Sequence, residues 1–275
     1  MSAAPVLYVS HGAPTVALEK GPYASALAAF GAANRPRAVA IVSAHWTTHW
    51  EIGITSAERH RLIYDFGGFP EELYRIAWPA PGDPEVAARA ATLLDSAGFR
   101  PRLDSVRGLD HGAWIPLRLV WPEADVPVVQ LALPEVPAEA LLRFAAALAP
   151  LREEGVLLVA SGGVVHNLLE VRLGDERVDH WARSFDAWAA ERIEALDADG
   201  LARWRERGPY AALAAPSTEH FDPLLVAVGA RLAGDRVETL HEGFQHGNLS
   251  MRSFALRDGR HVPAAPRHDE RKVGP

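Results

Sequence analysis

The sequence of 275 residues contains no cysteine. This absence excludes disulfide bonds, thiolate metal sites and cysteine nucleophiles, and it leaves histidine and carboxylate side chains as the available metal ligands. There is also no run of about 20 apolar residues, so no segment is expected to span a bilayer. Because the N-terminus lacks a basic segment that leads into an apolar core, we expect no secretory signal and a cytoplasmic protein.

Positive charge is scarce as well. The chain has 28 Lys and Arg against 35 Asp and Glu, a net charge of −7, which disfavours nucleic acid and anionic membranes as partners. The nucleotide-binding patterns G-x-x-x-x-G-K-[ST] and G-x-G-x-x-G are absent, as are the hydrolase patterns H-E-x-x-H and G-x-S-x-G. What the chain does have is 12 histidines and 8 tryptophans.

A serine followed by a histidine comes directly after three apolar, β-prone runs. The pairs are Ser10 and His11, Ser43 and His45, and Ser161 and His166, after the runs 6–9, 38–42 and 156–160. In an open α/β sheet, ligands bind beyond the carboxyl ends of the strands. We therefore expect these three histidines to meet at one edge of a sheet, where they could hold a metal ion.

Strand-like and helix-like segments alternate along the chain, which indicates an α/β fold. Further strands are expected at 51–55, 99–103, 126–133, 236–240 and 253–257, and helices at 24–33, 83–97, 138–148, 178–196 and 217–232. Residues 56–81 and 108–114 are expected to be loops. The prediction is one catalytic domain over 1–275, with a mainly parallel or mixed central sheet, helices on both faces and a metal site at the strand carboxyl ends. Residues 258–275 are expected to form a loose tail.

Taken singly, each candidate histidine also has an ordinary structural explanation. His11 and His45 could be hydrogen-bonded residues at strand ends, His111 and His166 could each stabilise a turn, and His220 could cap the helix that follows it. Together they favour a metal site, because neutral imidazole binds Fe(II), Zn, Cu and Ni well. The dipole of a following helix would help to keep His220 neutral.

Seven motifs occur in an order that is similar to a known family. They are Ser10–Pro14, Ser43–Trp46, Tyr64–Tyr74, Leu109–Leu117, Ser161–Leu168, Glu219–Leu224 and Gly247–Phe254. Together they resemble the class III extradiol ring-cleavage dioxygenases of the LigB superfamily, in the branch like 4,5-DOPA dioxygenase. The resemblance extends from about Val6 to about Leu256.

The resemblance implies a non-haem metal ion bound by His11, His45 and His220. His166 would act as acid and base or as an additional ligand, and His111 would contact the substrate. The ion would be Fe(II), with Zn(II) as the alternative, and the reaction would open the ring of a catechol-type, DOPA-like substrate with O2. More distant relatives use a glutamate as the third ligand, so Glu219 is an alternative to His220.

Four aromatic residues are candidate walls of the substrate pocket: Tyr64, Phe66, Phe69 and Trp114. The chain departs from the family pattern at Ala13, where serine is more common, and at Gly67, where an aromatic residue is more common. Gly67 lies in the loop expected to form the wall, so this difference bears on the choice of substrate.

Two other functions remain open from the sequence. A zinc-dependent hydrolase could use the same histidines, because zinc lowers the pKa of bound water but has no redox chemistry. A non-catalytic metal-binding module would instead have four protein ligands, with His166 as the fourth. Oxygen uptake with catechols would distinguish the dioxygenase from both.

Overall fold

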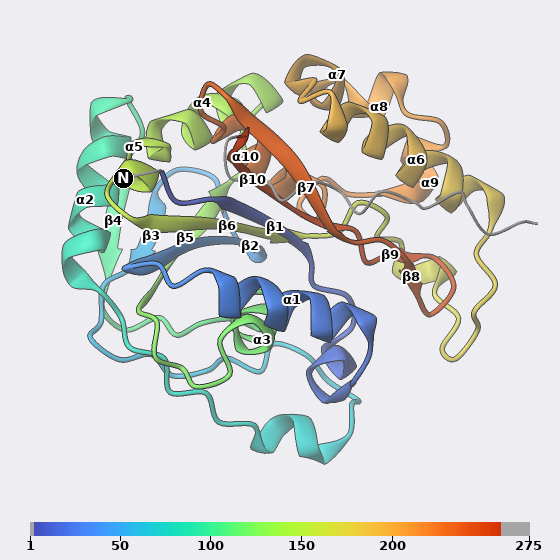
Figure 1. Cartoon of the computed structure of the whole chain (residues 1–275), viewed down its shortest axis with the longest axis horizontal. Coiled ribbons are helices and arrows are strands. Elements are labelled where there is room, and N and C mark those ends of the chain that lie inside the picture. The colour runs from blue at the N-terminus through green and yellow to red at the C-terminus, as the bar shows by residue number, and fades with distance from the viewer. Residues whose placement is uncertain (1–2, 260–275) are drawn as a thin grey trace, which may run out of the picture.

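The computed structural model describes residues 3–259, and a sheet of eight strands runs through them (Figure 1). The strands are β1 (Val6–Ser10), β2 (Ala38–Thr48), β3 (Ile52–Thr55), β4 (Pro101–Asp104), β5 (Val128–Pro134), β6 (Val156–Gly162), β7 (Asp235–His241) and β10 (Ser253–Asp258). Their spatial order is β4-β3-β5-β2-β6-β1-β10-β7. A separate two-stranded sheet pairs β8 (Phe244–Gln245) with β9 (Leu249–Ser250).

Helices connect the strands and cover both faces of the sheet. The α-helices are α1 (Pro22–Ala33), α2 (Pro84–Ser96), α3 (His111–Val120), α4 (Ala138–Leu148), α5 (Pro150–Glu153), α6 (His180–Glu194), α7 (Ala198–Ala202), α8 (Trp204–Arg207), α9 (Ala211–Ala214) and α10 (Asp222–Gly229). Three 3-10 helices are η1 (Pro14–Leu18), η2 (Glu71–Arg75) and η3 (Leu168–Glu170). Among the described residues, none of these helices is long and apolar enough to cross a membrane.

The four central strands are parallel, and this determines where the site lies. The order β5-β2-β6-β1 has parallel pairing throughout, whereas β3 pairs with β5, and β10 with β1, in antiparallel fashion. In this register Ser161 of β6 lies opposite Val9 of β1 and Ser43 of β2. The carboxyl ends of three strands therefore meet at one edge, which is the position where open α/β sheets bind ligands.

Alternate residues of each central strand enter two separate apolar cores. Val6 and Tyr8 pack on the face covered by α2, α4, α6 and α10, and Leu7 and Val9 pack on the face covered by α1 and α3. Figure 1 shows α1 and α3 on one side of the sheet and α4 and α10 on the other. Burial on both faces explains why these strands are continuous apolar runs. The α/β prediction with helices on both faces is confirmed.

Two local expectations were wrong. Residues 108–114 were expected to form a loop, but α3 begins at His111, because the Asp110 side chain caps it by accepting from the Ala113 amide. The alternation of apolar and polar residues over 51–55 predicted a half-buried strand, but all four residues of β3 are buried, because α2 packs against the strand and the Trp46 ring lies against Gly53. The loose tail predicted from 258 lies outside the described residues, apart from its first two positions, of which Asp258 ends β10.

Candidate metal centre

Five histidines from five segments surround one cavity of about 290 Å³. His11 follows β1, His45 lies in β2, His111 begins α3, His166 follows β6 and His220 precedes α10. The parallel strands bring the first, second and fourth of these segments to the same edge, and α3 and α10 add the other two. The structure therefore places all five predicted histidines together.

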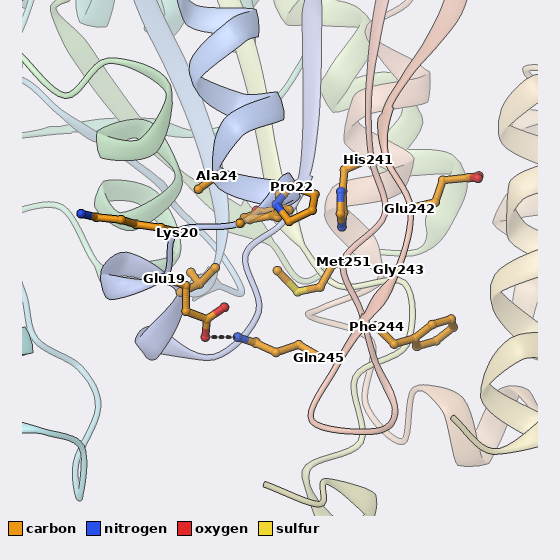
Figure 2. Close-up of a pocket in the computed structure, with 13 residues that line it drawn as sticks. Glu19, Lys20, Pro22, Ala24, His241, Glu242, Gly243, Phe244, Gln245 and Met251 are labelled. Carbon is orange, nitrogen blue, oxygen red and sulfur yellow. Dashed lines mark hydrogen bonds between the residues drawn. The ribbon is translucent and has the colours of Figure 1, made fainter. Parts of the chain in front are cut away.

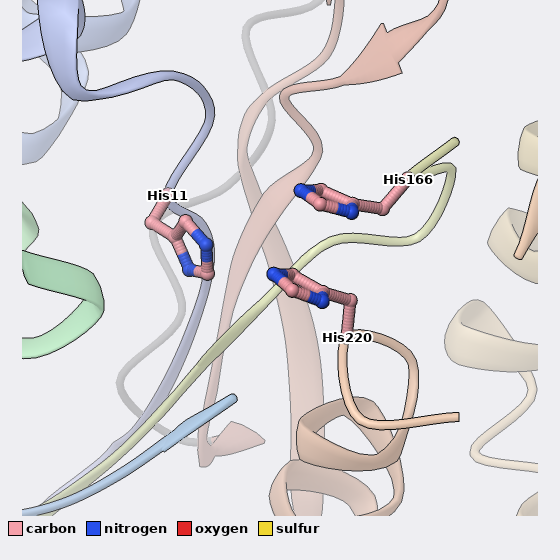
Figure 3. A group of neighbouring side chains, drawn as sticks. All are labelled: His11, His166 and His220. Carbon is pink, nitrogen blue, oxygen red and sulfur yellow. The ribbon is translucent and has the colours of Figure 1, made fainter. Parts of the chain in front are cut away.

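The nitrogen atoms of these histidines form two overlapping groups that could hold a metal ion. One group is His11, His166 and His220, and the other is His11, His45 and His111; within each group the ligand atoms lie within 4.8 Å of one another. Figure 3 shows the ring of His11 facing two parallel rings, those of His166 and His220, whose centroids are 3.5 Å apart. His45 and His220 fall in different groups, and their ring centroids are 5.1 Å apart.

Ser161 fixes the tautomer of His11. The Ser161 hydroxyl donates its only hydrogen to the carbonyl of Gly112, with an O–O distance of 2.5 Å. It can therefore only accept from His11, whose Nδ1 lies 3.0 Å away. His11 then carries its proton on Nδ1, and the lone pair on Nε2 faces the other histidines.

The carbonyl of Gly112 is free for this bond because Pro116 lies inside α3. Proline has no amide hydrogen, so the carbonyl four residues earlier loses its partner in the helix. The same glycine packs against the neighbouring histidine: a Cβ at Gly112 would lie 2.4 Å from Ser43 Oγ and 2.7 Å from His45 Cδ2. An apparent helix breaker and a glycine thus hold α3 against the metal centre.

Asp110 anchors the start of α3, and with it His111. Its buried carboxylate accepts from Ser43 Oγ at 2.8 Å, from the Ala113 amide at 3.1 Å and from Gln130 Nε2. Burial raises the pKa of this carboxyl, although the hydrogen bonds from Gln130 and Ser43 oppose the shift. Asp110, the acidic residue that precedes His111 in the sequence, is therefore a helix cap.

His220 is held by Glu219 from the side away from the other rings. Its Nδ1 lies 3.0 Å from Glu219 Oε1, so it donates there, and its buried Nε2 has no hydrogen-bond partner among the described residues. The hydrogen bond from His220 lowers the pKa of Glu219 to about 2. A carboxylate behind a histidine is the usual arrangement for fixing the tautomer and orientation of a metal ligand.

Asp65 contacts two of the histidines from the 56–81 loop. Its Oδ1 accepts from the His111 amide at 2.9 Å and lies 3.0 Å from His111 Nδ1, while its Oδ2 lies 3.5 Å from His45 Nδ1. Burial raises the pKa of Asp65, but the hydrogen bonds and charge interactions with His111 outweigh this and lower it. One carboxylate thus ties the loop to the site.

Burial keeps three of the imidazoles uncharged at neutral pH. Desolvation, followed by the other histidines, lowers the pKa of His11 well below its ordinary value and that of His45 to about 2. Desolvation and the neighbouring His220 lower the pKa of His166 to about 3. Neutral imidazole is the form that ligates a metal ion.

These residues fit a divalent metal ion. His11 Nε2 and His45 Nε2 are 3.1 Å apart. Because the bond to Ser161 keeps the proton of His11 on Nδ1, His11 Nε2 carries a lone pair. Two ligand nitrogens, each about 2.1 Å from an ion, are separated by roughly this distance. The unpartnered Nε2 of His220 adds a third donor. If His45 carries its proton on Nδ1, toward Asp65, both Nε2 atoms present lone pairs, and a cation between them would be held by both.

The four predicted wall residues fall into two pairs. Phe66 and Phe69 line the cavity, as does Gly67. Tyr64 and Trp114 do not line it: the Tyr64 hydroxyl donates to Ile76 O at 2.6 Å, and the fully buried Trp114 donates through Nε1 to Ile63 O at 3.1 Å. Tyr64 and Trp114 instead pack behind the lining residue Phe66, since the Tyr64 ring contacts the rings of both Phe66 and Trp114.

Several lining residues were missed by sequence reasoning. Asp65 stands between Tyr64 and Phe66, and a carboxylate in an aromatic loop was a usable signal. His246 also lines the cavity, although in the sequence it was interpreted, like the other histidines outside the five candidates, as a surface or packing residue. Four further lining residues are apolar, and nothing in their sequence distinguishes them from core residues: Leu168, Val171, Leu173 and Leu249.

Figure 2 shows a second cavity, of about 430 Å³. Gln245 and Met251 line it, and Gln245 bonds to Glu19, as Figure 2 shows. Both also contact the segment after His11: Gln245 Oε1 accepts from the Ala13 amide, and a Cβ at Gly12 would lie 2.7 Å from Met251 Sδ. With φ of +64°, Gly12 is required twice, for its backbone conformation and for this close approach.

The fold and the histidine cluster define an α/β protein with a site suited to a metal ion, and comparison with known proteins identifies its family. The family described as "Catalytic LigB subunit of aromatic ring-opening dioxygenase" matches residues 5–256. The chain therefore belongs to the LigB family of aromatic ring-opening dioxygenases, and it is an extradiol dioxygenase.

Named relatives support this assignment over most of their length. The chain is 36% identical over 253 residues to "4,5-DOPA dioxygenase extradiol" of Beta vulgaris, covering 90% of this chain and 94% of the relative. It is 38% identical over 259 residues to the protein of the same name from Escherichia coli K12, covering 92% and 94%. The crystal structure of an uncharacterized protein from E. coli K12 superimposes with a TM-score of 0.78 at 34% identity, covering 92% of this chain and 99% of the other.

Proposed function

We propose that this enzyme uses Fe(II) to open the ring of a catechol, with O2 as the second substrate. The observation that carries the proposal is the cluster of five histidines at the floor of a cavity whose walls include aromatic and aliphatic side chains. Imidazole suits iron, and a site with three protein ligands leaves positions for a substrate and oxygen. When bound, the ion would supply Lewis-acid and redox chemistry to the catechol and oxygen.

The proposed ligands are His11, His45 and His220. The hydrogen-bond pattern supports this choice, because in His11 and His220 the Nδ1 atom donates to a protein acceptor and leaves Nε2 for the ion. The Nδ1 of His45 likewise faces Asp65. Glu219, the alternative third ligand, is already engaged with His220 and with the Ser217 hydroxyl.

We assign proton transfer to His166 and contact with the reacting oxygens of the substrate to His111. His166 lines the cavity, and no other side chain among the described residues hydrogen-bonds its ring, so the ring is open to exchange a proton with the substrate. Because burial lowers the pKa of His166, its protonated form would be a strong acid that returns the proton to the substrate. Asp65 Oδ1 lies 3.0 Å from His111 Nδ1, and His111 lines the cavity, so Nε2 would be the nitrogen that contacts the substrate. Phe66 and Phe69 would pack against the substrate.

Metal binding by single variants tests the choice of ligands. His220→Ala should abolish binding of Co(II), followed by its absorbance. Glu219→Ala should bind about 10- to 100-fold more weakly, because it removes only the group that orients the ligand. Loss of binding in Glu219→Ala with retention in His220→Ala would make the glutamate the ligand.

Oxygen uptake tests the reaction itself. The protein is purified without oxygen, loaded with Fe(II), and mixed with a panel of catechols in air-saturated buffer. We expect uptake together with a yellow ring-opened product. Cleavage of esters or amides by the zinc-loaded protein, with no uptake from any catechol, would support a hydrolase. No activity of either kind would support a metal-binding module.

A further inference from the structure

The backbone around His11 is held by the sheet up to that residue and by a side chain just after it. The amide of Ser10 donates to Arg252 O at 3.2 Å, and the amide of His11 donates to Gly162 O at 3.0 Å. Two residues later, the Ala13 amide donates to Gln245 Oε1 at 2.9 Å. Gln245 therefore holds the segment through which the chain leaves the proposed metal ligand.

Glu19 fixes the orientation of the Gln245 carboxamide. Gln245 Nε2 donates to Glu19 Oε1 at 2.7 Å, as the dashed line in Figure 2 marks. A carboxylate can only accept a hydrogen bond, and a backbone amide can only donate one. The side-chain nitrogen of Gln245 must then face Glu19, and its oxygen must face Ala13.

The same oxygen packs against the residue that directly follows His11. Gly12 has a φ of +64°, and a Cβ at this position would lie 2.8 Å from Gln245 Oε1 and 2.7 Å from Met251 Sδ. The carboxamide thus contacts Gly12 and hydrogen-bonds Ala13. These two contacts leave the backbone after His11 little room to shift toward Gln245, and the hydrogen bond opposes a shift away from it.

Gln245 acts from outside the cavity that holds the histidines. Gly12, Ala13 and Pro14 line that cavity, whereas Gln245 is not among the described residues that line it. Gln245 lines the second cavity instead. A substrate beside the histidines would therefore meet the segment 12–14 and not the side chain that holds it, so a substitution of Gln245 leaves the substrate contacts in place.

We infer that Gln245 is a positioning residue for His11. Its carboxamide, oriented by Glu19, holds the backbone at Gly12 and Ala13 so that His11 Nε2 stays 3.1 Å from His45 Nε2. The inference rests on the proposed ligand set, in which these two nitrogens share the ion. Ser161 orients the ring of His11, and Gln245 fixes the backbone from which the ring projects. A ligand needs both, because metal–ligand distances vary by only about 0.2 Å.

Two variants separate the hydrogen-bond acceptor of Gln245 from its bulk. Gln245→Met keeps the length of the side chain but removes the carboxamide oxygen. We expect it to bind Co(II) about tenfold more weakly, the lower end of the usual effect of removing a supporting group, with a changed d–d absorption spectrum. Gln245→Glu combined with Glu19→Gln keeps an acceptor for Ala13 and reverses the bond to residue 19. This double variant should match the wild type in affinity and spectrum.

Thr239→Val is the control for general stability. Thr239 Oγ1 donates to Glu194 Oε1 at 3.1 Å, so this variant also removes a side-chain hydrogen bond, but one between β7 and α6. Neither residue lines the cavity of the histidines. Thr239→Val should leave the Co(II) affinity and the spectrum unchanged. All variants are compared at a temperature at which circular dichroism shows them to be fully folded.

The outcomes separate the inference from the proposed ligand set, for which His11→Ala is the reference and should lose Co(II) binding. If His11→Ala behaves so but Gln245→Met binds like the wild type, the inference is wrong and the ligand set stands. The same holds if the double variant is as weak as Gln245→Met, or if Thr239→Val loses affinity equally. If His11→Ala binds Co(II) as tightly as the wild type, the ligand set is wrong and the inference fails with it.

Discussion

At the scale of single residues, Ser161 decides which nitrogen of His11 faces the other histidines. Ser161→Ala should weaken Co(II) binding by about 10- to 100-fold, the usual effect of removing a group that orients a ligand. The ¹⁵N chemical shifts of the His11 ring, measured in the metal-free protein, are a second readout. They should show a single tautomer in the wild type and a mixture of two tautomers in Ser161→Ala. Unchanged shifts and affinity would refute the assignment.

Ser250→Ala is the control for that variant. Ser250 is also buried and donates its hydroxyl to a carboxylate, that of Asp186, at 2.6 Å. The Ser250→Ala variant should lose about 1 kcal/mol in the free energy of unfolding without any change in its affinity for Co(II). A loss of affinity in both variants would mean that Ser161 acts only through general stability.

His60 gives the fold a dependence on pH that is separate from the metal centre. Its Nε2 donates to Val128 O at 2.8 Å, its buried Nδ1 has no partner among the described residues, and burial lowers its pKa. Because the pKa is lower in the folded state, the stabilisation is complete above about pH 6.5 and is lost as the pH falls below it.

The check compares urea unfolding of the wild type and His60→Gln between pH 8 and pH 5. Below pH 6.5 the wild type should lose up to about 1.4 kcal/mol per pH unit more than the variant. Glutamine keeps a donor for Val128 O but cannot titrate. Parallel curves for the two proteins would show that His60 is protonated equally in both states.

At the scale of elements, the junction between α3 and β2 holds two of the histidines in place. Gly112→Ala would insert a methyl group within 2.4 Å of Ser43 Oγ and 2.7 Å of His45 Cδ2. We expect a loss of about 1–3 kcal/mol in the free energy of unfolding, together with weaker Co(II) binding.

Gly21→Ala is the matched control, since a Cβ at Gly21 meets nothing within 4 Å. It should change stability by less than about 1 kcal/mol and leave metal binding intact. Equal effects of the two substitutions, measured by urea unfolding and Co(II) titration, would mean that the contact between α3 and β2 does not position His45.

Elements marked by a long apolar pattern were predictable from the sequence, and an element whose start depends on one side chain was not. The runs before His11, His45 and His166 are buried on both faces, so their apolar character was visible in the sequence. The start of α3 depends on the cap at Asp110, whereas the glycines at 108 and 112 favoured a loop. The positions of Leu173 and Asp65 in the cavity lining were missed, because they depend on how the 56–81 loop and the segment after β6 come together in the fold.

At the scale of the whole molecule, the metal ion should stabilise the fold, because its proposed ligands, His11, His45 and His220, come from three segments that are far apart in sequence. At a free metal concentration 100 times Kd, binding adds about 2.7 kcal/mol to stability, which corresponds to a rise in Tm of roughly 5 °C for a domain of this size. Thermal unfolding with Co(II) and then with excess EDTA should show the rise and its reversal. His220→Ala should show neither, and an equal rise in that variant would place the ion elsewhere.

The most direct test of the central proposal is the fate of labelled oxygen. The Fe(II)-loaded protein is supplied with 4-methylcatechol and ¹⁸O2, and the ring-opened product is reduced at once, to prevent exchange at its aldehyde, and analysed by mass spectrometry. The account predicts that both atoms of one O2 molecule appear in a single product and that one equivalent of O2 is consumed per ring opened. A product with no label, or an oxidised but intact ring, would contradict it.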